Sequence, residues 1–293
     1  MIMRIRLPYS ILLTSALAVA AACTGKPADS HEYTLQGQVL SIAGDHKEAT
    51  IKHEDIKGFM PAMTMPYKVR EGKELENLTP GDLINATLVV ESNDAYLKGI
   101  KKVGQAPLEK APETMRTASA GFELLKDGEP VPTTSFIDQD GKKRTFTSFA
   151  GKAVVLTFIY TRCPMPTFCP MMDRNFVALQ DRIKADPNLG VHLVTVSFDP
   201  ATDTPAVLKA HGTKLGFNPR IWTFLTGDRD EIDRFASRFG VSVARAMTDQ
   251  KDITHNLRTA LIDRQGNLVK TYTGNEWTPA EVMADIKILV GVD

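Results

Sequence analysis

The hydrophobic pattern of the chain has one period before residues 104–121 and another after them. Residues 104–121 themselves are rich in Pro, Ala, Glu, Lys and Ser. Before this segment, residues 33–103 contain short β-type runs separated by turn residues. From residue 122 onward, apolar strand-type runs alternate with helical patterns. A change of period of this kind separates two cores, so we predict domains at residues 33–103 and 122–293, joined by a linker over 104–121.

The first domain is expected to be all-β. Five runs have the β-branched and aromatic character of strands: residues 33–35, 38–40, 49–51, 84–90 and 96–100. Five short strands in so few residues predict a small closed barrel of the OB type.

The second domain is expected to be an α/β sandwich of the thioredoxin-like kind. Strands are predicted at residues 133–137, 143–147, 153–160, 191–198, 221–225, 257–263 and 267–272, and helices at 170–184, 205–215, 231–239 and 279–289. The run at 153–160 is continuously apolar, which is typical of a central buried strand. The order strand, helix, strand, then hairpin and helix indicates this fold.

The N-terminus has the pattern of an export signal over residues 1–22. Arg4 and Arg6 precede the uncharged stretch Leu7 to Ala22, which ends in small residues immediately before Cys23. A cysteine in this position resembles a bacterial lipobox, which implies that Cys23 carries a lipid and that residues 23–32 are a tether. An ordinary signal peptide followed by an unrelated cysteine, or an uncleaved anchor, remains open.

Charge and cysteine content narrow the possible functions. The chain has 35 Lys and Arg against 35 Asp and Glu, so no overall attraction to nucleic acid is expected. Its three cysteines are too few for a disulfide scaffold, and each therefore needs its own chemical explanation.

Two of the cysteines, Cys163 and Cys169, lie between the expected central strand and the first long helix. If Pro170 is the first helical residue, Cys169 is the N-cap, where the helix dipole favours a thiolate. Two prolines stiffen the loop and allow Cys163 to fold back toward Cys169. His255 precedes the strand expected at 257–263 and can reach the cysteines from its loop. Two thiolates and one imidazole suit copper.

Other interpretations of these residues stay open. The pair can form a structural disulfide, and His255 alone would be a surface or capping histidine. Zinc is disfavoured because the cysteine spacing is long and a fourth ligand is missing from the pattern. Met165 can add a thioether, although filling a gap is the commoner task of methionine, and Met171 and Met172 are expected in the core.

The first domain contains a second group of soft ligands. Met63 and Met65 are two residues apart and project from one face if the segment is a strand, and His53 on a preceding strand can meet them. One imidazole and two thioethers favour Cu(I) over zinc, calcium or magnesium. The alternative is a methionine-rich barrel core with an exposed His53.

Over residues 122–292 the sequence resembles the Sco/SenC family of copper-binding thioredoxin-fold proteins. The resemblance is carried by Tyr160-Thr161-Arg162-Cys163-Pro164, Phe198-Asp199-Pro200 with Asp203-Thr204-Pro205, and Thr254-His255 with Leu261-Ile262-Asp263. It implies that Cys163, Cys169 and His255 bind copper destined for cytochrome oxidase, and that the cysteines can form a thiol–disulfide couple. The usual spacing in that family is three residues between the cysteines, whereas this chain has five.

Residues 33–103 resemble the CusF-type periplasmic copper-binding domain, which is a small OB barrel whose motif ends in Met-Thr-Met. The resemblance implies copper ligands at His53, Met63 and Met65. Met60 occupies the place where that family often has a tryptophan over the metal. Met60 is thus a further candidate ligand, and Phe59 a candidate lid.

These observations predict an exported copper chaperone, held on a membrane by a lipid at Cys23. It would bind Cu(I) or Cu(II) and deliver copper to a copper-accepting protein such as a cytochrome oxidase subunit. A thiol–disulfide oxidoreductase is the alternative from another class, with Cys163 attacking and Cys169 resolving, or the reverse if the helix dipole dominates. A copper-buffering protein would use the same ligands. No nucleic-acid partner is expected.

Overall fold

The computed structural model describes residues 29–108, 123–245 and 253–291. The expected signal peptide, Cys23 and most of the expected linker lie outside these ranges. Within them, no helix combines the length and the apolar character needed to cross a bilayer.

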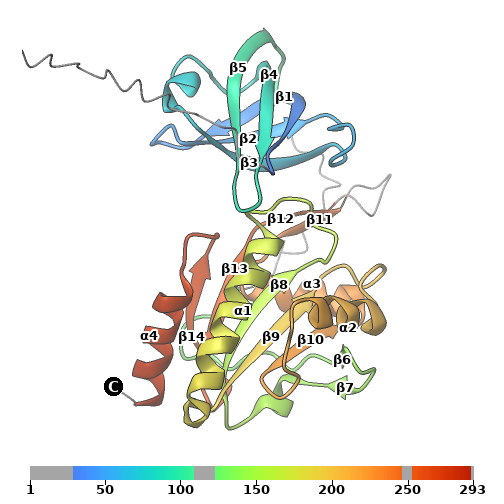
Figure 1. The fold of residues 1–293 in the computed structure, drawn as a ribbon, viewed down its shortest axis with the longest axis vertical. Helices are drawn as coiled ribbons and strands as arrows, with labels where there is room; N and C mark the ends of the chain where they lie inside the picture. The colour runs from blue at the N-terminus through green and yellow to red at the C-terminus, as the bar shows by residue number, and fades with distance from the viewer. Residues whose placement is uncertain (1–28, 109–122, 246–252, 292–293) are drawn as a thin grey trace, which may run out of the picture.

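The N-terminal domain is a closed five-stranded barrel, in which each strand is bonded to two others in the order β1-β2-β3-β5-β4 (Figure 1). The strands are β1 (His31–Ile42), β2 (Glu48–His53), β3 (Met63–Val69), β4 (Asp82–Val90) and β5 (Ala95–Gln105), with a 3-10 turn η1 at Gly72–Leu75. The ring closes through the parallel pair β3–β5, and all other pairs are antiparallel. The all-β barrel expected here is therefore present.

The barrel closes because β1 pairs with strands on both of its edges. Gly37 lies opposite His53 of β2 and opposite Ile84 of β4. A Cβ atom at Gly37 would lie 2.6 Å from the carbonyl oxygen of Lys52, so the close approach of β2 requires glycine at this position.

Two details of the barrel differ from the expectation. The runs expected at 33–35 and 38–40 belong to the single strand β1, because the glycine between them allows close pairing rather than a turn. The strand β3 was not among the five expected runs, because Pro66 has no N–H group for a sheet ladder and lowers the strand signal.

The C-terminal domain is built on a seven-stranded sheet with the order β14-β13-β8-β9-β10-β6-β7 (Figure 1). Its strands are β6 (Phe136–Asp138), β7 (Lys143–Arg144), β8 (Ala153–Ile159), β9 (Val191–Ser197), β10 (Trp222–Thr226), β13 (Arg258–Ile262) and β14 (Leu268–Thr273). The helices are α1 (Cys169–Ala185), α2 (Pro205–Lys214), α3 (Arg229–Arg238) and α4 (Pro279–Val290), with 3-10 turns η2 (Phe146–Phe149) and η3 (Pro187–Leu189). Every strand and helix expected in this domain is found.

The centre of the sheet is apolar, as the sequence pattern requires. Strands β8 and β9 run parallel, and all seven residues of each are buried. Helices α1 and α4 pack against each other, and α1 also lies on β8 and β9. A short hairpin, β11 (Val243–Arg245) with β12 (Ile253–His255), was not expected from the sequence and lies next to the barrel (Figure 1).

Candidate metal centres

The two cysteines occupy the loop between β8 and α1, where the backbone turns back on itself. The N–H of Cys163 donates to the carbonyl oxygen of Tyr160 at 3.3 Å, and the N–H of Phe168 donates to that of Met165 at 3.0 Å. The first helical residue is Cys169 itself and the N-cap is Phe168, so the expectation of Cys169 as N-cap was one residue off. Phe168 provides no side-chain cap, unlike Thr204, Asp228 and Thr278, the N-caps of the other three described helices.

Two buried carboxylates hold the first part of this loop. Asp203 accepts hydrogen bonds from Thr161 Oγ1 at 2.5 Å, from the Thr161 N–H at 3.0 Å and from Ser197 Oγ at 2.5 Å. Asp199 pairs with Arg162 at 2.8 Å. The residues of the motif at 198–205 therefore hold the segment that follows β8 and leads to Cys163. This anchoring role of the motif was not evident from the sequence.

The second part of the loop is held by side chains from other elements. Arg174 of α1 donates to the carbonyl oxygen of Pro166 at 2.9 Å, and Asn275 donates to that of Thr167 at 2.8 Å. The two prolines of the loop, Pro164 and Pro166, have no N–H group and donate no backbone hydrogen bond. The loop between the cysteines is thus anchored at both ends.

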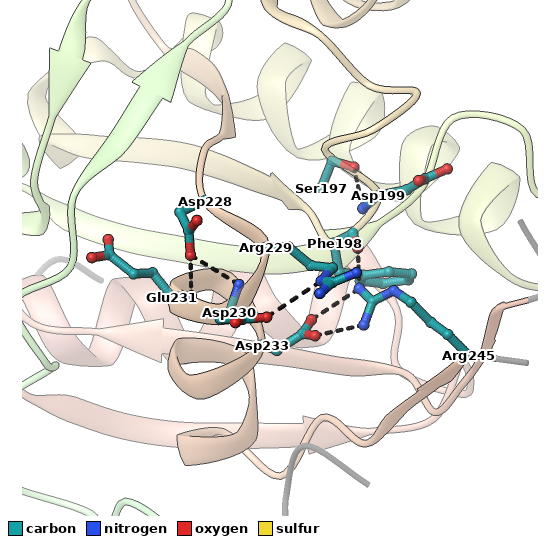
Figure 2. A network of polar contacts seen from close by, with 9 residues as sticks. All are labelled: Ser197, Phe198, Asp199, Asp228, Arg229, Asp230, Glu231, Asp233 and Arg245. Carbon is teal, nitrogen blue, oxygen red and sulfur yellow. Dashed lines mark hydrogen bonds and ion pairs between the residues drawn. The ribbon is translucent and has the colours of Figure 1, made fainter. Parts of the chain in front are cut away.

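His255 lies on β12 rather than in a loop ahead of the next strand. Its partner in the hairpin is Val243 of β11. The same hairpin carries Arg245, whose guanidinium pairs with Asp233 of α3 at 2.5 and 2.9 Å and donates to the carbonyl oxygen of Phe198 (Figure 2). Arg245 thereby ties the hairpin that presents the histidine to α3 and to the end of β9.

The orientation of the His255 ring leaves one nitrogen facing the cysteines. Nδ1 donates to the carbonyl oxygen of Asn256 at 2.9 Å, so Nδ1 carries the proton and Nε2 has a free lone pair. Nε2 lies 3.7 Å from Cys169 Sγ. The rings of Tyr160, Phe198 and Phe168 surround the imidazole, with the Phe198 centroid 4.6 Å away.

The two thiols are electrostatically unequal. Hydrogen bonding from Cys169, together with contact with His255, holds the pKa of Cys163 well below its usual value. Burial raises the pKa of Cys169 well above its usual value, and the Cys163 sulfur raises it further. The direction of these shifts favours Cys163 over Cys169 as the thiolate of the pair, contrary to the dipole argument for Cys169. Both cysteines are free thiols in the structure.

Cys163, Cys169 and His255 contact one another without forming a finished coordination sphere. Within the described ranges, no group of three or more His, Cys, Asp or Glu side chains has the arrangement of a preformed metal site. Softness of the sulfur ligands favours Cu(I) for such a site.

In the barrel, His53 shows the same ring arrangement as His255. Its Nδ1 donates to the carbonyl oxygen of Glu54 at 2.7 Å, which leaves Nε2 unprotonated. Nε2 is buried and has no hydrogen-bond partner among the described residues. Burial lowers the pKa of His53 and keeps the imidazole neutral. The side chain is only 2% exposed, so the alternative of an exposed His53 is wrong.

Three methionines lie near this imidazole. Met63 of β3 is paired directly with His53, and Met65 follows on the same face beside Ile51. Met60 is buried and accepts a long hydrogen bond from the Tyr67 hydroxyl at 3.8 Å. Phe59, the candidate lid, stacks on Tyr33 with centroids 4.6 Å apart. A neutral imidazole with a buried free lone pair and adjacent thioethers fits a Cu(I) ion.

The two sets of ligands face each other across the domain boundary. Strand β3 of the barrel contacts β12, and a cavity of about 20 Å³ lies between the domains. Its lining includes the predicted ligands Met60, Met63, Met65, Cys163 and His255 and the candidate Met165. His53 and Cys169 are not part of the lining. The volume is that of one or two water molecules.

The fold and these residues define a protein of two domains, one OB-like and one thioredoxin-like. Each domain holds side chains that can bind a soft metal. Residues 129–291 match the family model described as SCO1/SenC, which is more than half of the chain, and residues 32–102 match that of the copper binding periplasmic protein CusF. The chain belongs to the SCO1/SenC family and carries a CusF domain at its N-terminal end. Both resemblances are confirmed, and the description of the CusF family model names copper, the expected metal.

Individual relatives agree with this assignment. The SCO1 protein homolog of Bacillus subtilis (strain 168) is 30% identical over 173 residues, which are 58% of this chain and 88% of the relative. The mitochondrial SCO1 homolog 1 of Arabidopsis thaliana is 32% identical over 143 residues, 48% of this chain and 41% of that protein.

Among solved structures, a SCO1/SenC family lipoprotein from Bacillus anthracis str. Ames is 32% identical, with a TM-score of 0.50. It covers 57% of this chain and 99% of its own. The expected fold class is confirmed.

Proposed function

We propose that the protein is an exported copper chaperone that holds Cu(I) at two sites and delivers it to a copper-accepting protein. One observation carries the proposal: in each domain a histidine donates its Nδ1–H to the carbonyl oxygen of the following residue, which leaves Nε2 free. Nε2 of His255 lies 3.7 Å from Cys169 Sγ, and His53 is paired across the sheet with Met63. The ligands are Cys163, Cys169 and His255 in one domain and His53, Met63 and Met65 in the other. These ligand sets suit Cu(I) and disfavour hard cations.

Family membership and the N-terminal sequence support a particular acceptor and location. The Sco/SenC resemblance supports a copper site of cytochrome oxidase as the destination. Export is supported by the signal-like residues 1–22 and by the periplasmic description of the CusF family model. A lipid anchor at Cys23 is supported by the lipobox-like position of this cysteine and by the relative from Bacillus anthracis, which is described as a lipoprotein.

The stoichiometry of Cu(I) binding tests this function. Anaerobic titration of the full chain against a chromophoric Cu(I) chelator is expected to give two copper ions per chain. His53→Ala should remove the barrel copper and His255→Ala should weaken the other site, each leaving its neighbour loaded. His31→Ala, a change of a histidine outside both sites, is the control. No copper retained, or two copper ions retained by both variants, would contradict the proposal.

A second function is favoured by the inequality of the thiols. A low pKa at Cys163 and a high pKa at Cys169 are the properties of an attacking and a resolving cysteine. In that function Cys163 attacks a partner disulfide, Cys169 displaces the reduced partner, and an external reductant restores the pair. Turnover of a protein disulfide by the copper-free chain, lost in Cys163→Ser, would support it, and an absence of turnover would leave the chaperone function alone.

A further inference from the structure

The boundary between the domains is lined by sulfur from both sides. Met60, Met63 and Met65 reach it from the barrel, and Cys163 and Met165 reach it from the loop of the other domain. Cys163 packs against the buried clusters of both domains. Members of both proposed ligand sets therefore line the same cavity.

Met165 belongs to neither family motif, and its placement is unusual. It lies in the cysteine loop, which is two residues longer than the usual spacing, yet its side chain packs within the buried apolar cluster of the barrel. Only 4% of it is exposed. The hydrogen bonds at Pro166 and Thr167 hold the loop in this position. The extended loop thus carries a thioether from one domain into the other.

A gap-filling role would need only an apolar side chain of this size. Met165, however, lines the cavity together with three methionines of the barrel, Cys163 and His255. The other sulfur and imidazole side chains of the lining all belong to the candidate ligands of the two centres: Met60, Met63, Met65, Cys163 and His255. A cavity of about 20 Å³ is large enough for a single ion.

Building on the proposed function, we propose that this cavity is itself a Cu(I) position and that Met165 is a ligand shared by both centres. Copper passes between the domains by ligand exchange. Bonds to Met63 and Met65 break as bonds to Met165, Cys163 and His255 form, or the reverse. The ion stays Cu(I) throughout, no electron is transferred, and a thiol that binds copper releases its proton to the buffer.

Methyl NMR of the full chain, labelled with [ε-¹³C]methionine and kept reduced, tests the shared ligand. One equivalent of Cu(I) should shift the Met165 methyl resonance together with those of Met63 and Met65. Met165→Leu identifies the resonance and preserves the volume of the side chain. Met171, half-buried in the same segment and outside the cavity lining, should not shift.

Different outcomes of this experiment would overturn the proposed function and the shared Cu(I) position. If no methionine resonance moves and no copper is retained, the proposed function itself is overturned. If Met63 and Met65 shift while Met165 does not, copper binds but the shared position is overturned.

A second measurement addresses the contribution of Met165 to retention of the ion. In chelator competition at one copper per chain, Met165→Leu should lower the Cu(I) affinity at least about tenfold, equal to about 1.4 kcal/mol. Met171→Leu should change it less than about twofold. Equal affinities of the two variants would contradict a ligand role for Met165, provided that both unfold at the temperature of the parent chain.

Discussion

At the scale of single residues, the chemistry of both centres depends on which ring nitrogen of a histidine carries the proton. A carbonyl oxygen only accepts, so the bonds from His53 to Glu54 and from His255 to Asn256 place the proton on Nδ1 in both rings. Nε2 is then available as a ligand. Residue type and spacing in the sequence predicted the histidines, but the backbone carbonyl that orients each ring became visible only in the structure.

The inequality of the thiols predicts different alkylation behaviour. In the reduced, copper-free chain, Cys163 should react with iodoacetamide well below pH 9, because its thiolate is stabilised, whereas Cys169 should stay unmodified until the domain unfolds. Peptide mass spectrometry over a pH series measures both rates. Faster modification of Cys169 would contradict the assignment and would restore the helix-dipole interpretation.

Because His192 is buried, we expect the folded C-terminal domain to lose stability in acid. Burial lowers the pKa of this histidine to about 4, and its Nε2 is hydrogen-bonded to Thr223 Oγ1 at 2.8 Å. The unfolded chain takes up the proton near pH 6.5, so the contribution of the neutral ring is complete above that pH and is lost as the pH falls toward 4. The free energy of unfolding should fall by about 3 kcal/mol over this range.

Urea unfolding of the C-terminal domain signal between pH 7 and pH 4 measures this effect. Other groups also titrate in this range, so the parent chain is compared with His192→Gln, which should have a shallower pH dependence by about the same amount. Identical slopes for the two proteins would show that the ring does not remain neutral in the folded domain.

At the scale of elements, the metal-site loop is held by its neighbours rather than by its own sequence. Asp203 receives three hydrogen bonds from the ends of β8 and β9, and Arg245 ties the β11–β12 hairpin to α3. The order of strands and helices was predictable from hydrophobic periodicity. The hairpin was not, because three-residue strands are too short to show a period.

Asp203→Asn tests the anchoring of the loop. The amide keeps one acceptor but turns an NH₂ group toward hydroxyl and N–H donors, so the domain should lose about 2 kcal/mol or more of its free energy of unfolding. The Cu(I) affinity of the site with Cys163 should fall with it. Asp230→Asn, which changes an exposed ion pair with Arg229, should cost less than about 0.5 kcal/mol. Equal urea midpoints for both variants would contradict the anchoring role.

A substitution at Gly37 tests the close pairing of β1 and β2 in the barrel. Gly37→Ala places a methyl group 2.6 Å from the Lys52 carbonyl, directly opposite His53, and should cost about 1 to 3 kcal/mol of barrel stability. Gly44→Ala is the matched control, because a Cβ there meets nothing within 4 Å. Thermal unfolding followed by far-UV circular dichroism distinguishes the two variants, and an unchanged transition in Gly37→Ala would show that β1 and β2 can separate without loss.

At the scale of the whole molecule, two domains that the sequence separates meet at their proposed metal ligands. Both sets of candidate residues were visible as local motifs in the sequence, because each motif holds its residues within a short stretch or on one recognisable fold. Their meeting was not predictable. It depends on the packing of β3 against β12 and on the insertion of Met165 into the barrel, and neither leaves a periodic signal in the sequence.

The central claim is that each domain holds Cu(I) through an imidazole and sulfur. Copper K-edge X-ray absorption of the full chain, labelled with selenomethionine and loaded anaerobically with two Cu(I) ions, tests it most directly because selenium and sulfur neighbours are resolved separately. The account predicts nitrogen, selenium and sulfur neighbours together, with the selenium contribution strongly reduced in His53→Ala. Copper surrounded by nitrogen and oxygen alone, or by thiolate sulfur without selenium, would contradict it.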